Sequence, residues 1–125
     1  MEWDILIVGG GVVGCALARL LSAYDARIAV LERGEDVAAG ASKANSGIVH
    51  AGFDAKPGSL KAKFNVEGSR MYEAFCREVG APYAQPGAMV LAFHGEELPR
   101  LQGLLEQGRV NGVDGLRLLG REETL

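Results

Sequence analysis

The sequence lacks the features that mark secreted, membrane-spanning or nucleic-acid-binding proteins. Its 125 residues include only two cysteines, Cys15 and Cys76, without a CxxC spacing, so we expect buried, reduced thiols and no metal site. No apolar run approaches the roughly 18 residues that span a bilayer, and no secretory signal follows Met1. The net charge of −3 argues against a general nucleic-acid surface. We therefore expect a cytoplasmic protein without a transmembrane segment or a nucleic-acid partner, while peripheral membrane contact stays open.

The rest of the chain is organised around the stretch from Asp4 to Glu32. It contains an apolar run (5–8), a glycine-rich turn, a helix-like segment rich in small residues, and a second apolar run (28–31) that ends on Glu32. Four consecutive aliphatic residues without polar alternation are typical of a strand covered on both faces, as in a parallel sheet flanked by helices. The stretch predicts a βαβ unit of an α/β fold.

Three glycines after the first run have the GxGxxG spacing of a dinucleotide site: Gly9, Gly11 and Gly14. Gly9 lets the chain turn sharply off the strand. Gly11 has no Cβ, so a pyrophosphate can approach the N–H groups and the positive dipole end of the helix that begins here. Gly14 lets that helix lie close to the strands.

An acidic residue stands where such a site needs one. Glu32 follows Gly14 by 18 residues, at the end of the second run, and its carboxylate can accept hydrogen bonds from the hydroxyls of an adenosine ribose. The same charge would repel a 2′-phosphate, so FAD or NAD is favoured over NADP. The alternative is an ordinary βαβ turn that uses glycine only for its geometry.

A long segment without apolar periodicity, residues 33–47, follows this unit, and loops of this length inside a domain are usually functional. It leads into Asn45-Ser46-Gly47-Ile48-Val49-His50-Ala51-Gly52-Phe53 and then into residues 57–64. Residues 43–63 carry four lysines against one aspartate, a local charge of +3 that leaves −6 for the remainder. A positive segment in an acidic protein suits an anionic cofactor or substrate, although a solvated lysine face is an equal alternative.

These motifs resemble the FAD-dependent oxidoreductases of the D-amino-acid oxidase superfamily, especially glycerol-3-phosphate dehydrogenases and L-2-hydroxyglutarate oxidases. The resemblance covers essentially the whole chain and is strongest in residues 4–14 and 45–64. It implies FAD as cofactor and a Rossmann-like FAD-binding βαβ unit with a parallel sheet, followed by the start of an α+β substrate domain. The boundaries we expect are 1–80 for the FAD-binding part and 81–125 for the beginning of the substrate domain.

The resemblance also implies roles for single residues. Ser42 and Lys43 would meet the pyrophosphate, and Asn45, Ser46 and Gly47 would pass under the isoalloxazine ring. The full set of expected cofactor-binding residues is Gly9, Gly11, Gly14, Glu32, Arg33, Ser42, Lys43, Asn45, Ser46 and Gly47.

His50 would stand near the flavin ring and the substrate, where it is the candidate catalytic residue. Its functional interpretations are a hydrogen-bond donor to the flavin, a base that removes a substrate proton, and a covalent flavin anchor. The plainer interpretation is a histidine that packs the end of a buried segment.

The second half of the chain reads as mixed structure. Apolar residues at helical spacing, with Ser59 as N-cap and Gly80 as the stop, predict a helix over 59–79 whose apolar stripe is core: Leu60, Phe64, Met71, Tyr72, Phe75, Cys76 and Val79. We expect a strand, turn and strand over 83–93, a helix from about Leu98 that ends at Gly112, and a strand over 116–119. Residues 121–125 begin another helix with nothing left to pack on, so we expect an N-terminal fragment.

The function we predict from the resemblance is transfer of a hydride from a CH–OH carbon of a small anionic substrate to flavin, with glycerol 3-phosphate as the best substrate. The alternatives are L-2-hydroxyglutarate and, third, an amine or amino acid. The electron acceptor, whether oxygen, a quinone or a partner protein, stays open. Two alternatives of other kinds are a non-catalytic dinucleotide-binding module and an NAD-dependent dehydrogenase, although the motif 45–53 has no role in a simple NAD site.

Overall fold

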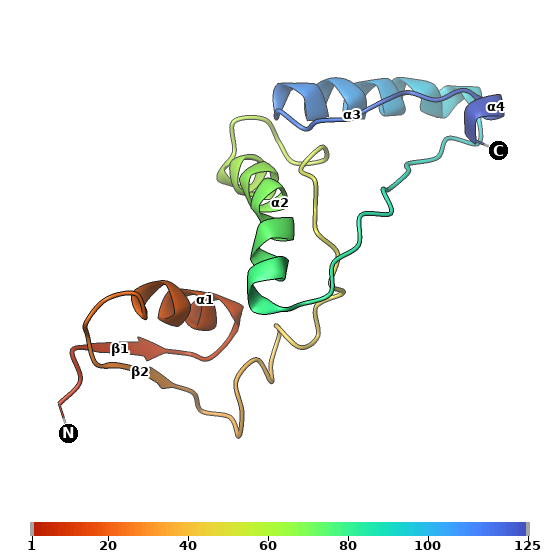
Figure 1. Cartoon of the computed structure of the whole chain (residues 1–125). Coiled ribbons are helices and arrows are strands. Elements are labelled where there is room, and N and C mark those ends of the chain that lie inside the picture. Colours follow the sequence, from red (N-terminus) through yellow and green to blue (C-terminus); the bar gives the residue numbers. More distant parts are fainter. Residues whose placement is uncertain (1, 125) are drawn as a thin grey trace. The chain divides into compact units, whose positions relative to one another are not determined.

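The computed structural model describes residues 2–124, which form two compact units, one up to Ile48 and one from Val49 onward. The first unit contains strand β1, helix α1 and strand β2 (Figure 1). The second unit contains helices α2 and α3, the short 3-10 turn η1 before α3, and the single-turn helix α4. Their bounds are β1 (Ile5–Val8), α1 (Val12–Leu21), β2 (Ile28–Leu31), α2 (Leu60–Val79), η1 (Gly95–Glu97), α3 (Leu98–Val110) and α4 (Arg121–Thr124).

The first unit is the predicted βαβ unit. β1 and β2 are parallel, with Ile5 opposite Ile28 and Val8 opposite Leu31. α1 lies along the strands (Figure 1) and packs near Ile7, whose side chain is only 6% exposed. Side chains alternate between the two faces of a sheet, so Leu6, Val8 and Leu31 share the other face, where they are exposed.

An ion pair joins the residues that precede the two strands. The guanidinium of Arg27 donates from Nε and Nη2 to the two carboxylate oxygens of Asp4, both at 3.0 Å, and the Arg27 N–H donates to the same carboxylate. The side-chain bonds from Arg27, and then its backbone N–H, hold the pKa of Asp4 below its usual range. The pair therefore fixes the start of β1 against the start of β2.

Helix α2 has the predicted ends. The Ser59 hydroxyl accepts a hydrogen bond from the Ala62 N–H at 3.2 Å, which satisfies one of the free donors of the first turn. Gly80 closes the helix with a φ of +68°, the left-handed conformation that glycine adopts without strain. α3 also forms where its leucines predicted it, and Gly112, with a φ of +80°, follows its end.

The prediction that the apolar stripe of α2 belongs to the core is wrong. Leu60, Phe64 and Met71 are 70%, 59% and 69% exposed, and of that stripe only Cys76 is buried. The buried positions of the helix are Ala62, Val66 and Cys76. The face that is covered near residue 66 is the one against Gly52, since a Cβ on that glycine would stand 3.0 Å from Val66 Cγ2.

The strands predicted at 83–93 and 116–119 are also wrong, since both segments are irregular. β1 and β2 form the one sheet within residues 2–124, so neither segment meets a partner strand there. Met89, Val90, Leu91 and Phe93 are accordingly between 49% and 80% exposed. A short apolar run alone cannot make a strand, because strand formation depends on cross-strand pairing.

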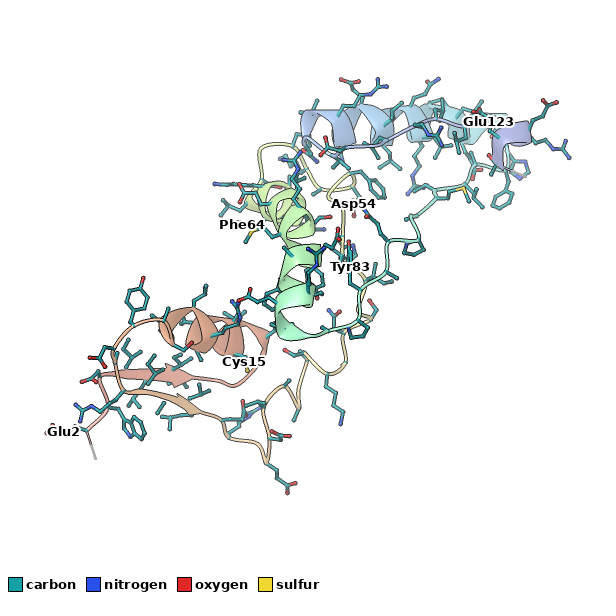
Figure 2. All side chains as sticks on the ribbon, in the orientation of Figure 1. Glu2, Cys15, Asp54, Phe64, Tyr83 and Glu123 are labelled. Carbon is teal, nitrogen blue, oxygen red and sulfur yellow. The ribbon has the colours of Figure 1, made fainter. Side chains whose placement is uncertain are left out.

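Both cysteines are free thiols. Cys76 is buried as expected, whereas Cys15, labelled on α1 in Figure 2, is half-buried, and its thiol lies 3.3 Å from the carbonyl oxygen of Gly10. Across residues 2–124, no helix combines the length and apolar character needed to cross a bilayer. The helix expected from Arg121 forms as far as Thr124, and Leu125 lies outside the described residues.

Candidate functional site

The turn between β1 and α1 has the geometry of a phosphate-binding loop. Gly9 leaves the strand with a φ of +100°, a conformation that other residues rarely adopt. Gly11 is the N-cap of α1 in an extended conformation. A Cβ placed on Gly14 would run into the carbonyl oxygen of Gly9, so only glycine lets the helix approach the turn this closely. The first turn of α1 is thus presented at the carboxyl end of β1.

Glu32 joins the end of β2 to this loop. Its Oε2 accepts a hydrogen bond from the Gly10 N–H at 2.7 Å, and its Oε1 accepts one from the Gly34 N–H at 2.9 Å. These bonds, with Gly34 the larger cause, hold the pKa of Glu32 below its usual range, so the side chain is a carboxylate at neutral pH. Each carboxylate oxygen still has accepting capacity, because an ionised carboxyl offers about four lone-pair positions.

Ser42 lies at the N-terminus of α1 although it is 30 residues away in sequence. Its Oγ accepts a hydrogen bond from the Val12 N–H at 2.9 Å. A hydroxyl accepts and donates at once, so Ser42 can also donate to a phosphate oxygen. A turn places it there: the Ala38 N–H donates to the Gly10 carbonyl at 2.8 Å, and the Lys43 N–H donates to the Ala38 carbonyl at 3.0 Å.

These groups enclose a cleft of about 660 Å³ within the first unit. A Cβ on Gly11 would stand 3.3 Å from the Ser42 Oγ, so the absence of that side chain keeps the wall at the helix N-terminus open. The residues that line the cleft are Val8, Gly9, Gly11, Leu31, Glu32, Arg33, Gly34, Ala38, Ala39, Gly40, Ala41 and Ser42.

The chemistry of this lining matches a nucleotide better than a purely apolar ligand. A helix N-terminus and a hydroxyl can meet phosphate oxygens, while an exposed carboxylate can accept hydrogen bonds from sugar hydroxyls. Gly11 and Gly40 leave backbone rather than side chains in the wall. The groups present therefore fit the pyrophosphate and ribose of a dinucleotide.

The other expected cofactor residues lie outside this lining. Lys43 is exposed beside Ser42. The Asn45 Oδ1 accepts a hydrogen bond from the Gly47 N–H at 2.8 Å, and Gly47 has a φ of +71°, so Asn45, Ser46 and Gly47 form a local turn. Their contacts with a cofactor stay a prediction.

His50 is exposed and belongs to the second unit. The segment that follows it, Gly52–Ala55, is fixed by hydrogen bonds from α3 and from Asn111, the C-cap of that helix. Gln107 Nε2 donates to the Phe53 carbonyl at 3.0 Å, and Asn111 Nδ2 donates to the Gly52 and Ala55 carbonyls at 2.9 and 2.7 Å. Figure 2 labels Asp54 in this segment.

Reasoning from the sequence missed two glycines of the site. Gly10 is buried, and a Cβ there would stand 3.0 Å from Val37 Cγ1 and 3.1 Å from Glu32 Oε2. Gly34 supplies the second N–H that holds the Glu32 carboxylate. The run of three glycines at 9–11 was the available signal for Gly10, because the motif itself leaves that position unspecified.

Comparison with known proteins agrees with this geometry. Residues 4–125 match the family described as DAO, FAD dependent oxidoreductase. The chain is 46% identical over 123 residues to a glycerol 3-phosphate dehydrogenase of Caloramator mitchellensis, covering 98% of this chain and 26% of that protein. It is also 46% identical over 124 residues to the human mitochondrial L-2-hydroxyglutarate dehydrogenase, covering 98% of this chain and 27% of the relative.

A solved structure gives the same result. L-alpha-glycerophosphate oxidase from Mycoplasma pneumoniae, dithionite-reduced and with FAD bound, superposes with a TM-score of 0.77 at 34% sequence identity, covering 99% of this chain and 33% of that one. This chain therefore spans about a quarter to a third of the length of these proteins. The predicted fold class, a Rossmann-like βαβ unit, is confirmed by this likeness. The chain belongs to the DAO family of FAD-dependent oxidoreductases.

Proposed function

We propose that the protein containing this chain oxidises a CH–OH carbon of a small anionic substrate by transferring its hydride to FAD. The observation that carries the cofactor half of the proposal is the cleft in which Glu32, the N-terminus of α1 and Ser42 converge. In this proposal residues 1–80 are the FAD-binding part, and residues 81–125 begin the substrate domain.

The residues of the first unit bind and orient the cofactor. The carboxylate of Glu32 accepts hydrogen bonds from the ribose hydroxyls while it keeps the N–H groups of Gly10 and Gly34. The backbone at Gly11 and the hydroxyl of Ser42 hold the pyrophosphate. By family resemblance, Lys43 adds positive charge to the pyrophosphate side, and Asn45, Ser46 and Gly47 line the ring.

When bound, FAD supplies the hydride acceptor at N5 of its isoalloxazine ring. By the same resemblance, His50 lies near the reacting carbon, and its imidazole accepts the hydroxyl proton of the substrate. Two other roles for His50, hydrogen bonding to the flavin and covalent attachment of it, predict different outcomes when the residue is replaced, because neither one moves a substrate proton.

Glycerol 3-phosphate is the substrate we propose, and L-2-hydroxyglutarate is the second candidate. The two relatives with those names are each 46% identical to this chain, so similarity does not separate them. Both substrates carry a secondary alcohol near anionic groups, and the lysines of residues 43–63 give that part of the chain a positive charge.

The test is anaerobic bleaching of the flavin in the full-length protein. The purified protein should show flavin absorbance bands, and these bands should bleach with sn-glycerol 3-phosphate or with L-2-hydroxyglutarate, but not with alanine. Bleaching by an amino acid alone would contradict oxidation of an alcohol. A yellow protein that no hydroxy acid, polyol phosphate or amino acid bleaches would favour a non-catalytic module, and a colourless protein would favour an NAD site.

A further inference from the structure

The segment directly after His50 is held far more firmly than its irregular backbone suggests. Gly52 and Ala55 are buried, with Ala55 only 1% exposed. Gly52 has a φ of +97°, so its backbone conformation suits glycine and few other residues. His50 is only two residues away, and its Cα can lie at most about 7 Å from that of Gly52.

Gln107 of α3 and Asn111, the residue after α3, donate hydrogen bonds to three carbonyl groups of this segment. Asn111 uses its amide nitrogen to donate to two carbonyls, those of Gly52 and Ala55, at 2.9 and 2.7 Å. Gln107 donates to the carbonyl between them, that of Phe53, at 3.0 Å. These contacts join positions 54 to 59 residues apart in sequence, so they fix tertiary structure rather than a local turn.

The surroundings leave the segment little freedom to move. A Cβ on Gly52 would stand 3.0 Å from Val66 Cγ2 of α2, and a Cβ on Gly108 of α3 would stand 3.0 Å from the Cβ of Phe53. The end of α3 is itself anchored, because Arg70 of α2 donates to the Gly112 carbonyl at 2.7 Å and pairs with Asp114 at 2.9 Å. Residues 52–55 are therefore held between α2 and α3, and Arg70 of α2 in turn holds the residues that follow α3.

We propose that Asn111 and Gln107 are positioning residues that hold His50 in the orientation its reaction requires. This inference rests on the proposed function, in which His50 faces the substrate. The amide groups act through the carbonyls of residues 52–55, and they would touch neither the cofactor nor the substrate. A displacement of about 1 Å at a reacting group can lower a rate about 100-fold, so removing these hydrogen bonds should slow flavin reduction strongly.

The test compares Asn111→Ala and Gln107→Ala with a matched control, Gln102→Ala, in the full-length, FAD-loaded protein. Gln102 is an exposed residue of α3, the helix that contains Gln107. The measurement is the anaerobic flavin-reduction rate per bound flavin, with whichever of sn-glycerol 3-phosphate and L-2-hydroxyglutarate reduces the wild type. We expect Asn111→Ala to slow reduction at least about tenfold, Gln107→Ala to slow it less, and Gln102→Ala to match the wild type within about twofold.

A double-mutant cycle separates positioning from a general loss of structure. In a His50→Gln background, Asn111→Ala should change the remaining rate by less than about twofold, because the group it positions is gone. Equal fold-losses in both backgrounds would overturn the inference, as would a wild-type rate for Asn111→Ala. If Asn111→Ala does not load FAD, Gln107→Ala, which removes one bond instead of two, completes the same cycle.

The failure of the inference can be told apart from the failure of the proposed function. If His50→Gln slows reduction and Asn111→Ala does not, only the positioning role is contradicted. If His50→Gln itself reduces at the wild-type rate, the role of His50 in the proposed function is contradicted and the positioning role falls with it.

Discussion

Replacing Gly14 by alanine should destabilise the first unit, although alanine is the better helix former. A Cβ at this position would overlap the carbonyl oxygen of Gly9 and stand 3.1 Å from the Gly9 carbonyl carbon and 3.4 Å from Ile7 Cγ2. The obstacle is mainly backbone, in a turn whose φ of +100° leaves few alternatives. α1 would have to move away from β1.

The magnitude follows from two opposed effects. Overpacking costs about 1–3 kcal/mol, and a clash with backbone belongs at the upper end of that range. The gain in helix propensity from Gly to Ala is about 1 kcal/mol. The net loss should therefore be roughly 2 kcal/mol, about a 30-fold change in the ratio of folded to unfolded protein.

Urea unfolding of the full-length protein, followed by circular dichroism, measures this loss. Gly103→Ala is the matched control, because Gly103 is an exposed glycine within α3 and a Cβ there would meet no atom within 4 Å. That variant should be equally stable or more stable by up to about 1 kcal/mol. A Gly14→Ala protein as stable as Gly103→Ala would refute the close approach of α1 to Gly9.

Three further predictions concern the cleft. Gly11→Val places a branched side chain beside Ser42 at the N-terminus of α1, so the protein should lose FAD and keep its far-ultraviolet circular dichroism spectrum. A variant with full flavin content would show that this loop is not the pyrophosphate site. Ser42→Ala removes the acceptor of the Val12 N–H and a donor to phosphate, so the FAD dissociation constant, measured by fluorescence titration, should rise roughly three- to tenfold. An unchanged dissociation constant would exclude Ser42 from the site. The N–H groups of Gly34 and Gly10 hold the pKa of Glu32 below its ordinary value of 4.5, so its contribution is complete above that value and is lost as the pH falls through the lowered pKa. Titration from pH 8 to 3 should show a constant FAD affinity down to pH 4.5 and a fall only below it, and a loss of affinity already between pH 8 and 6 would contradict this assignment.

The parts of the fold that the sequence predicted correctly depend on local signals. The βαβ unit rests on two continuous apolar runs and on glycines whose spacing has a mechanical reason, and β1, α1 and β2 form where expected. Helix α2 begins after the hydroxyl cap of Ser59 and ends at the left-handed Gly80, two signals that act within one turn of the helix.

The parts that could not be predicted depend on partners far away in sequence. Residues 88–93 form a continuous apolar run after the turn residues Pro86 and Gly87, but a strand needs a neighbouring strand, which a single sequence does not specify. The stripe of α2 failed for a related reason, since periodicity identifies an apolar face and not the segment that covers it.

The same distinction applies to the site. Gly9, Gly11, Gly14 and Glu32 belong to a motif with fixed spacing, and the structure brings them to one cleft or, for Gly14, directly behind it. The hydrogen bonds that Glu32 accepts from Gly10 and Gly34 could not be predicted. Binding of a ribose is enough to explain an acidic residue at this position, so the sequence gives no sign of these two bonds. Gln107 and Asn111 carry no motif at all, and only tertiary packing shows their contacts with residues 52–55.

The central claim, that FAD binds in the cleft of the first unit through Glu32, is tested most directly by the FAD dissociation constant of Glu32→Gln. The amide of glutamine has one acceptor oxygen, so it cannot serve the N–H groups of Gly10 and Gly34 together as the carboxylate does, and it loses the charge that strengthens hydrogen bonds from ribose hydroxyls. Glu35→Gln removes the same charge from an exposed residue outside the cleft lining and serves as the control. We predict at least about a tenfold weaker affinity for Glu32→Gln, since hydrogen bonds to an ionised group are roughly twice as strong as those between neutral groups, and an unchanged affinity for Glu35→Gln. Equal dissociation constants for Glu32→Gln and the wild type would contradict the claim.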